Sequence, residues 1–214
     1  QTYKNIELIV VVDGGRDSTI DIVSRYCKTD SRIVLVKHKT NLGIAEARNS
    51  GIRIASGDFF GFCDSDDVWL PLKLEMQLEL MVTNGVSISH SSALLINNLG
   101  DVVGYRKSPN KVDYTMMRSR NHIINSSALV KQSSFSNMYQ SQMRHEDYDF
   151  WLRLFAQGAV SQSCDEPLLK YRVHGESITS NKLKSLLWMC LVQRKHGIEW
   201  STIFLNALQN CFSR

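Results

Sequence analysis

The sequence predicts an α/β domain, built on a mostly parallel sheet flanked by helices and followed by a helical tail. Two observations predict this class. Aliphatic, β-branched runs of strand length alternate with segments whose apolar residues recur at helical spacing, as in βαβ units. The last run of that series ends in carboxylates, and open α/β sheets bind ligands at strand ends. We expect residues 1–180 to form the domain and residues 181–214 the tail.

Three strands are expected in the first part of the chain. Residues 6–12 are largely aliphatic and stop at Asp13-Gly14-Gly15, which predicts a central parallel strand and a tight turn. Residues 33–37 predict a second strand. Residues 57–63 predict a third, buried strand, because their apolar run begins after a glycine and ends abruptly at charged residues.

Helices are expected between and after these strands. Asp17 is the expected N-cap of the first, with Ile20, Val23 and Cys27 on its apolar face, and Asn41 caps a second that runs to about Ile54. A third follows Pro71. Its apolar face would hold Leu74, Leu78, Met81 and Val82.

The second half of the chain is less regular. Residues 86–96 alternate loosely and turn at residues 97–100, which predicts an antiparallel hairpin. Residues 107–142 are polar and give no clear assignment. A helix beginning at Asp147 would bury Tyr148, Trp151, Leu154 and Phe155, and residues 166–173 predict a last strand.

Two amphipathic helices are expected in the tail. The first stripe comprises Leu183, Leu186, Leu187, Cys190 and Leu191. The second comprises Trp200, Ile203, Phe204, Ala207, Leu208 and Cys211. A basic stretch, residues 194–196, lies between them. Two explanations stay open: the helices lie on a membrane surface, or their stripes pack on the domain itself.

Bulk composition excludes several classes of protein. Of 214 residues, 43% are hydrophobic and 21% charged, which suits one globular domain, and a formal charge of +4 is too small for a nucleic-acid-binding protein. The five cysteines form no C-x-x-C pair, so reduced thiols and a cytoplasmic location are expected. No apolar run is long enough to span a bilayer.

Three carboxylates, Asp64, Asp66 and Asp67, follow the third strand within four positions. In extended backbone, Asp64 and Asp66 point to the same side, and oxygen ligands suit a hard cation such as Mg²⁺ or Mn²⁺. A simpler explanation is a solvated turn, since aspartate is common there. The spacing alone leaves both explanations open.

Five segments in order resemble the family 2 glycosyltransferases of GT-A fold, and the resemblance covers essentially the whole chain. They are residues 1–11 with Asp13, Gly14, Asp17 and Thr19; Asn41-Leu42-Gly43 with Ala47-Arg48-Asn49-Ser50-Gly51; Asp64-Ser65-Asp66-Asp67; Glu146 to Arg153; and Tyr171-Arg172-Val173-His174. Each motif alone is weak, whereas five in this order are specific.

The resemblance implies roles on the donor side of a nucleotide-sugar site. Asp13 would contact the nucleotide base, and Arg48 would lie near the base or the diphosphate, as suits a carboxylate and a guanidinium. Asp64 and Asp66 would form the Asp-x-Asp site that holds the cation, with His174 near the metal or diphosphate. Alternatively, Asp13 is a turn residue, Arg48 is a solvated helix residue and His174 is a structural histidine.

The resemblance also assigns the catalytic residues. Asp147 would be the base that deprotonates the acceptor hydroxyl, with Glu146 beside it as a supporting or acceptor-binding residue. Two acids at a helix start would also simply favour its positive end.

Three features depart from the family pattern. Val12 stands where relatives commonly have a first aspartate, and residues 136–142 replace the usual lead into the Glu-Asp pair. The family's first strand and helix would precede Gln1, so the chain is expected to begin inside its fold.

The expected function is that of an inverting, metal-dependent glycosyltransferase. It would move a sugar from a nucleotide donor, expected to be a UDP-sugar, to a saccharide or lipid-linked saccharide. The stretch from Leu168 to Lys184 resembles bacterial transferases that build cell-surface polysaccharides, which implies that kind of product. Residues 182–214 could bind the inner face of the plasma membrane peripherally. The alternative is an inactive or truncated remnant that at most binds nucleotide or a partner. A nucleotidyltransferase is disfavoured because no glycine-rich phosphate loop with a basic residue occurs near the N-terminus.

Overall fold

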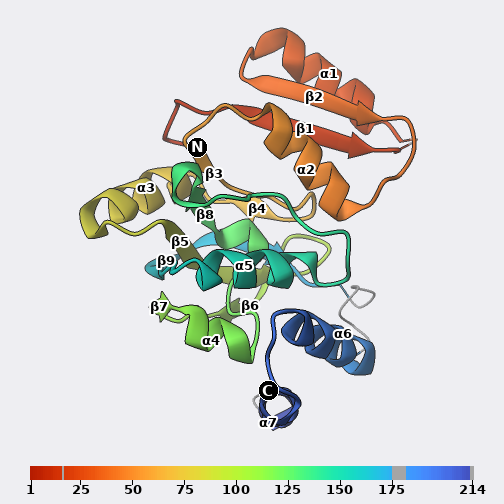
Figure 1. Cartoon of the computed structure of the whole chain (residues 1–214). Helices are drawn as coiled ribbons and strands as arrows, with labels where there is room; N and C mark the ends of the chain where they lie inside the picture. Colours follow the sequence, from red (N-terminus) through yellow and green to blue (C-terminus); the bar gives the residue numbers. More distant parts are fainter. Residues whose placement is uncertain (16, 175–181, 213–214) are drawn as a thin grey trace.

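A computed structural model of the chain describes residues 1–15, 17–174 and 182–212, and it describes their side chains except those of Lys182 and of residues 211–212. The strands of the described residues form two separate sheets, one of two strands near the N-terminus and one of seven. Figure 1 shows the first sheet with helices α1 and α2 at one end of the molecule, and helices α6 and α7 at the other. The chain is therefore a mixed α/β fold with the expected helical tail.

The N-terminal unit consists of β1 (Leu8–Asp13), α1 (Thr19–Thr29), β2 (Ile33–His38) and α2 (Ile44–Ile54). β1 and β2 pair in parallel over their full length. The predicted strands and helices are thus confirmed. The prediction that β1 is a central strand is wrong for the described residues, because β2 is its one neighbour among them.

The helix starts differ from the predicted ones. Ser18 rather than Asp17 is the N-cap of α1, although an Asp17 oxygen accepts the Thr19 amide at 3.0 Å. Gly43 rather than Asn41 precedes α2, with a φ of 93° that favours glycine. Asn41 still accepts the Gly43 amide at 3.1 Å. Both predicted caps are therefore polar residues of the turn that leads into the helix.

The larger sheet has the strand order β3-β8-β5-β9-β4. Its strands are β3 (Phe59–Phe60), β4 (Val68–Trp69), β5 (Ile88–Ile96), β8 (Leu129–Lys131) and β9 (Ser161–Arg172), with β6 (Val102–Arg106) beside β5 and β7 (Lys111–Val112) beside β9. β5 and β9 are parallel, whereas the other pairings are antiparallel. The expectation of a mostly parallel sheet is corrected to a mixed one.

The third predicted strand is much shorter than expected. Residues 57–63 contribute only β3, two residues that pair antiparallel with β8. The hairpin of β5 and β6 is confirmed. The last strand, β9, begins five residues before the predicted start, because the stretch from Ser161 pairs alongside β5 as well.

The main core lies around α5 (Glu146–Ala156). All four residues predicted to be buried there are fully buried: Tyr148, Trp151, Leu154 and Phe155. Helix α3 (Lys73–Asn84) buries Leu74 and Met81 as expected, but Val82 is 77% exposed, which corrects its assignment to the apolar face. Helix α4 (Tyr114–Ser119) and the 3₁₀ turns η1 (Asn125–Ser127) and η2 (Gln132–Ser134) occupy the segment that had no clear assignment.

The tail forms α6 (Lys182–Lys195) and α7 (Trp200–Phe212). The predicted stripes divide between two faces. Leu186 and Cys190 pack on the main core, whereas Leu183, Leu187 and Leu191 are exposed. In α7, Ile203 is buried while Trp200, Phe204 and Leu208 are exposed, and the side chain of Cys211 lies outside the described part.

Two expectations concern cysteines and the membrane. Cys27, Cys63, Cys164 and Cys190 are free thiols. In the part of the chain that the structure describes, no helix combines the length and apolar character needed to cross a bilayer.

Candidate active site

Arg48 on α2 joins two acids that are far apart in the sequence. Its Nη2 donates to Asp64 Oδ1 at 2.6 Å, and its Nη1 donates to Glu146 Oε1 at 2.9 Å. The Arg48 side chain is only 10% exposed. Burial acts against its charge, but Asp64 and Glu146 outweigh that effect and raise the pKa of the guanidinium. The loop after β3 and the start of α5 therefore meet at α2.

Glu146 and Asp147 occupy the first turn of α5, where the helix dipole favours negative charge. The residue before them, His145, has a φ of 56°, an uncommon backbone conformation for a residue other than glycine. Burial and the neighbouring Asp147 charge raise the pKa of Glu146, although Arg48 opposes this. Asn121 donates to Asp147 Oδ2 at 3.0 Å and so fixes the carboxylate of the predicted base.

Gln140 is a site residue that the sequence did not reveal. Its side-chain oxygen accepts from Arg48 Nη1 at 3.0 Å. Its backbone is held from both sides by Asn49, whose amide group donates to the Gln140 carbonyl while its oxygen accepts the Gln140 amide. The one sequence signal for this contact is on α2, where the motif places Arg48 and Asn49 next to each other. The loop that meets them matched no family pattern.

Asp66 and His174 form a second pair. His174 Nε2 lies 3.0 Å from Asp66 Oδ2, and both side chains are partly exposed. Arg172 holds the loop beneath them, because its Nε donates to the Asp66 carbonyl at 3.0 Å and its Nη1 donates to the Asn97 carbonyl. The two ends of this pair, 108 residues apart in the sequence, are thus adjacent, as the motif interpretation requires.

Asp66 and His174 offer two metal-ligand atoms. An oxygen and a nitrogen donor side by side fit a cation such as Mn²⁺ that takes its other ligands from water and diphosphate oxygens. Among the described residues there is no group of three or more His, Cys, Asp or Glu side chains placed to hold a metal ion. The protein would therefore supply Asp66 and His174, while Asp64 is engaged by Arg48.

Asp67 lies beneath these exposed acids. It is 8% exposed, and its Oδ1 accepts the Arg172 amide at 3.0 Å. Burial, together with the charges of Asp64 and Asp66, raises the pKa of Asp67 to about 6. A solvated turn would leave such a group in water, so the turn explanation does not fit Asp67.

Asp13 lies at the end of β1 and is engaged within the protein. Its carboxylate accepts the amides of Leu42 and Gly43 at 2.8 Å each, and His38 Nδ1 lies 2.6 Å from Oδ1. Burial alone would raise the pKa of Asp13, but these contacts outweigh it and lower the pKa. Asp13 therefore holds the loop that leads into α2, and with it the start of the helix that carries Arg48.

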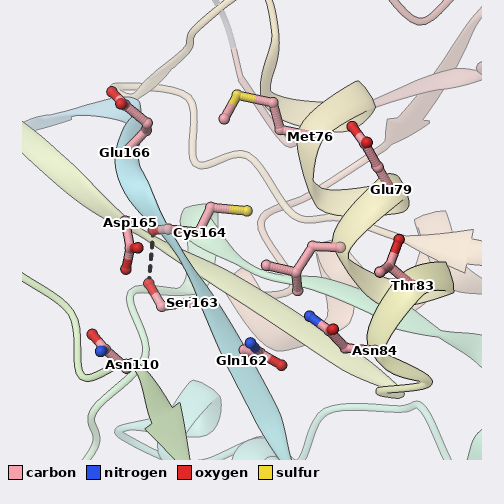
Figure 2. A pocket seen from close by; sticks show the side chains of 11 residues that line it. Met76, Glu79, Thr83, Asn84, Asn110, Gln162, Ser163, Cys164, Asp165 and Glu166 are labelled. Atoms are coloured by element: carbon pink, nitrogen blue, oxygen red, sulfur yellow. Dashed lines mark hydrogen bonds between the residues drawn. The ribbon is translucent and has the colours of Figure 1, made fainter.

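The groove in Figure 2 is a different feature. It has a volume of about 530 Å³ and lies between α3 and the first half of β9, lined by Glu79, Asn84, Gln162, Asp165 and Glu166 among others. Glu166 precedes Arg172 by six residues, which is roughly 20 Å of extended strand. The groove is thus at the opposite end of β9 from the acids, and no predicted site residue lines it.

Comparison with known sequences gives consistent matches. Residues 1–136 match the family described as "Glycosyl transferase family 2". The chain is 33% identical over 199 residues to the UDP-Glc:alpha-D-GlcNAc-diphosphoundecaprenol beta-1,3-glucosyltransferase WfaP of Escherichia coli, covering 93% of this chain and 78% of that protein. It is 37% identical over 188 residues to WfgD of the same organism, described by the same reaction, covering 87% of this chain and 73% of that protein.

Solved structures resemble the fold. TarS from S. aureus in complex with UDP-GlcNAc matches with a TM-score of 0.69 and 16% identity over 87% of this chain and 56% of that chain. The mannosyltransferase PcManGT from Pyrobaculum calidifontis, in complex with GDP-Man and Mn²⁺, matches with a TM-score of 0.65 and 15% identity over 90% of this chain and 55% of that chain. The chain spans a little over half the length of these two proteins, and at such identities the likeness concerns the fold.

Proposed function

The chain belongs to glycosyltransferase family 2 and has the fold of the GT-A transferases, and from this premise we propose that it transfers a sugar, with inversion, from a UDP-sugar to a saccharide acceptor. The observation that carries the proposal is the bridge made by Arg48. It brings the Asp64 loop and the Glu146–Asp147 pair into one site. The relatives WfaP and WfgD are named for transfer from UDP-Glc, which supports a uridine donor.

On the donor side, we assign Asp66 and His174 to the cation, with Mn²⁺ or Mg²⁺ as the expected ion. When bound, the cation would neutralise charge on the departing nucleoside diphosphate. The Mn²⁺ in the PcManGT complex supports the use of a divalent cation. The protein's own positive group on the donor side is the Arg48 guanidinium. It would pair with the diphosphate once Asp64 turns toward the donor. Asp13 would act on the base through the loop at Leu42 and Gly43.

On the acceptor side, Asp147 is the proposed base. Its carboxylate takes the proton of the acceptor hydroxyl as the hydroxyl oxygen forms its bond to the anomeric carbon and the bond from that carbon to the diphosphate oxygen breaks. Asn121 orients the carboxylate for this step. Glu146 holds Arg48 beside it and keeps the two halves of the site together.

The acceptor is proposed to be a lipid-linked saccharide used for bacterial surface polysaccharide. WfaP and WfgD are named for an acceptor on diphosphoundecaprenol, and TuaG of Bacillus subtilis, 29% identical, is named for teichuronic acid biosynthesis. The domain proposed for residues 1–180 would then act at the inner face of the plasma membrane. Residues 181–214 would associate with that membrane peripherally.

Donor hydrolysis and transfer test this proposal. We expect UDP release from a UDP-sugar in the presence of Mn²⁺. The rate should fall about 10²–10⁴-fold in Asp147→Asn, which is the rate contribution typical of a general base. Asp66→Ala should raise the Mn²⁺ concentration needed for half-maximal rate. The exposed Asp165→Asn, in the groove at the far end of β9, is the matched control and should leave the rate unchanged. Unchanged rates in both site variants would refute the assigned roles.

A further inference from the structure

Both C-terminal helices carry an exposed apolar stripe. In α6 the stripe is Leu183, Leu187 and Leu191, which are 81%, 58% and 51% exposed. In α7 it is Trp200, Phe204 and Leu208, which are 59%, 64% and 41% exposed, with Leu205 at 58% beside them. Residues spaced by four lie on one face of a helix, so each stripe is continuous along its helix.

The opposite faces of these helices already pack on the domain and form hydrogen bonds with it. Val192 on α6 and Ile203 on α7 are buried, as is Ile198 in the connection between the helices. The amide group of Gln193 donates to the carbonyls of Arg118 and Ser119 at the end of α4, and that of Asn206 donates to the Arg118 carbonyl. Each helix therefore packs on the domain through its inner face, and the exposed stripes take no part in that packing.

The two stripes meet at one point. Arg194 follows Leu187 by seven residues and Leu191 by three, so it lies on the face of the α6 stripe. Its guanidinium carbon lies 5.8 Å from the centre of the Trp200 ring, at the start of the α7 stripe. A cation–π contact thus joins the two stripes, and we call the combined surface the α6–α7 apolar face.

The charge of the chain is concentrated in this segment. Residues 182–214 contain five basic residues and one acid, Glu199, a net of +4. The formal net charge of the whole chain is also +4, so the remainder sums to zero. The sequence of α6 contains no acid, and that of α7 contains no charged residue. Within the segment, Lys195 is paired with Asp149.

We propose that the α6–α7 apolar face docks on an anionic lipid bilayer, with the stripes inserted at the level of the acyl-chain boundary. Apolar area flanked by cations, with a tryptophan at the junction, is the combination that binds helices to such surfaces. A second copy of the chain fits less well. A symmetric dimer would set one net-positive segment against another, and like charges oppose that contact.

The proposed orientation brings the active site near the membrane, and this step rests on the proposed function. Ser185 Oγ on α6 lies 3.2 Å from His145 Nε2, and His145 immediately precedes Glu146. At the other end of α6, Lys195 and His196 contact the buried Asp149 of α5 at 2.7 Å and 2.9 Å. A bilayer beneath α6 would therefore lie beside the helix that presents the base to a lipid-linked acceptor.

Vesicle binding of the full chain tests the docking surface. The probe is a set of vesicles of phosphatidylcholine with increasing fractions of phosphatidylglycerol, sedimented in the absence of donor and acceptor. We expect binding to rise with the anionic fraction and to fall with added salt. Phe204→Ser with Leu208→Ser, and separately Leu187→Ser with Leu191→Ser, should each weaken binding about tenfold or more.

The matched control replaces two equally exposed apolar residues elsewhere. Val82→Ser with Leu99→Ser removes side chains that are 77% and 87% exposed on other elements, and it should leave vesicle binding unchanged. Circular dichroism should show the same helix content in all variants, since every substituted residue is exposed. An equal loss in the control, or no binding to anionic vesicles at low salt, would overturn the proposal. So would a dimer in solution that the Phe204 and Leu208 variant abolishes.

The two proposals fail in different ways. If the transfer reaction is absent but vesicles bind as described, the docking surface stands and the assigned activity does not. If transfer to a water-soluble acceptor proceeds at the same rate in the wild type and in the Phe204 and Leu208 variant, while both fail to bind vesicles, the activity stands and the docking surface does not.

Discussion

The N-terminal unit and the region around α5 carry similar sequence signals but are buried very differently. All eleven residues of α1 are described, and none of them is buried, while β1 buries only Val12. Helix α5 has the same length and buries seven residues. Ile22 and Tyr26 on α1 are 41% and 59% exposed, whereas Leu154 and Phe155 on α5 are 0% exposed.

The difference shows how the two regions are joined. The N-terminal unit contacts the rest through polar groups at α2, where Arg48 and Asn49 bind the acids and Gln140, and at Gln1, whose amide donates to the Leu70 carbonyl. Half-buried Ile52 and Ala55 add apolar contact. The site therefore lies on a boundary whose geometry depends on hydrogen bonds and ion pairs as much as on packing.

The largest expected effect tests the packing side of this comparison. Leu154→Ala should lower the free energy of unfolding by about 2–5 kcal/mol, because it leaves a cavity in a closed core. Ile22→Ala, at a half-exposed position of α1, should cost less than about 1 kcal/mol. Urea denaturation measures both. Equal losses would show that α1 is covered in solution by something beyond the described contacts.

The next effect concerns the buried carboxylate of the α5 region. Asp149 is 0% exposed and accepts from Ser141 at 2.7 Å, besides its contacts with Lys195 and His196. Burial would raise the pKa of Asp149, but these partners hold it well below the ordinary range. Asp149→Asn should therefore cost about 2–4 kcal/mol at neutral pH.

The pH dependence of that variant follows from the sign of the shift. A carboxyl whose folded pKa is depressed stabilises the fold above its unfolded pKa of about 4, and this stabilisation is lost as pH falls toward the folded value. The difference between wild type and Asp149→Asn should shrink below about pH 4 in thermal unfolding at stepped pH. A difference that stays constant to pH 2 would contradict the assignment.

A smaller effect tests the boundary itself. Arg48→Gln leaves Asp64 and Glu146 without their shared partner, which should cost about 1–3 kcal/mol. Hydrogen exchange should become faster in α2 and β1, while the α5 amides stay protected. Faster exchange spread evenly over both regions would mean that Arg48 supports the whole fold rather than the joint.

The smallest effect lies within the N-terminal unit. Asp13→Asn keeps one acceptor oxygen but loses the second, so the amides of Leu42 and Gly43 cannot both be bound as before. We expect a loss of about 1 kcal/mol and faster exchange at those two amides. Asp21→Asn, an exposed acid of α1, is the control and should change neither.

Local patterns accounted for most elements, and the family motifs named most residues of the site. The apolar spacing of residues 148–155 predicted the buried face of α5, and the β-branched runs predicted β1 and β2. The motifs placed Arg48, Glu146 and Asp147 among the functional residues, and the structure brings them together with Asp64. The roles assigned to these residues remain predictions.

Other features were not predictable from local patterns. The length of β3 and the antiparallel pairings depend on which strands become neighbours, and Gln140 enters the site because a loop without any recognisable motif crosses α2. Leu186 and Leu187 are adjacent in one predicted stripe, yet one packs on the core and the other is exposed.

The sequence by itself determined which residues share a face of a helix or strand, because backbone geometry repeats every 3.6 or 2 residues whatever the surroundings. Tertiary structure decided which of those faces are covered and which acids pair with the guanidinium of Arg48. Burial and ion pairing depend on segments as far apart as Arg48 and Glu146, 98 residues along the chain, and only the folded chain sets the distance between them.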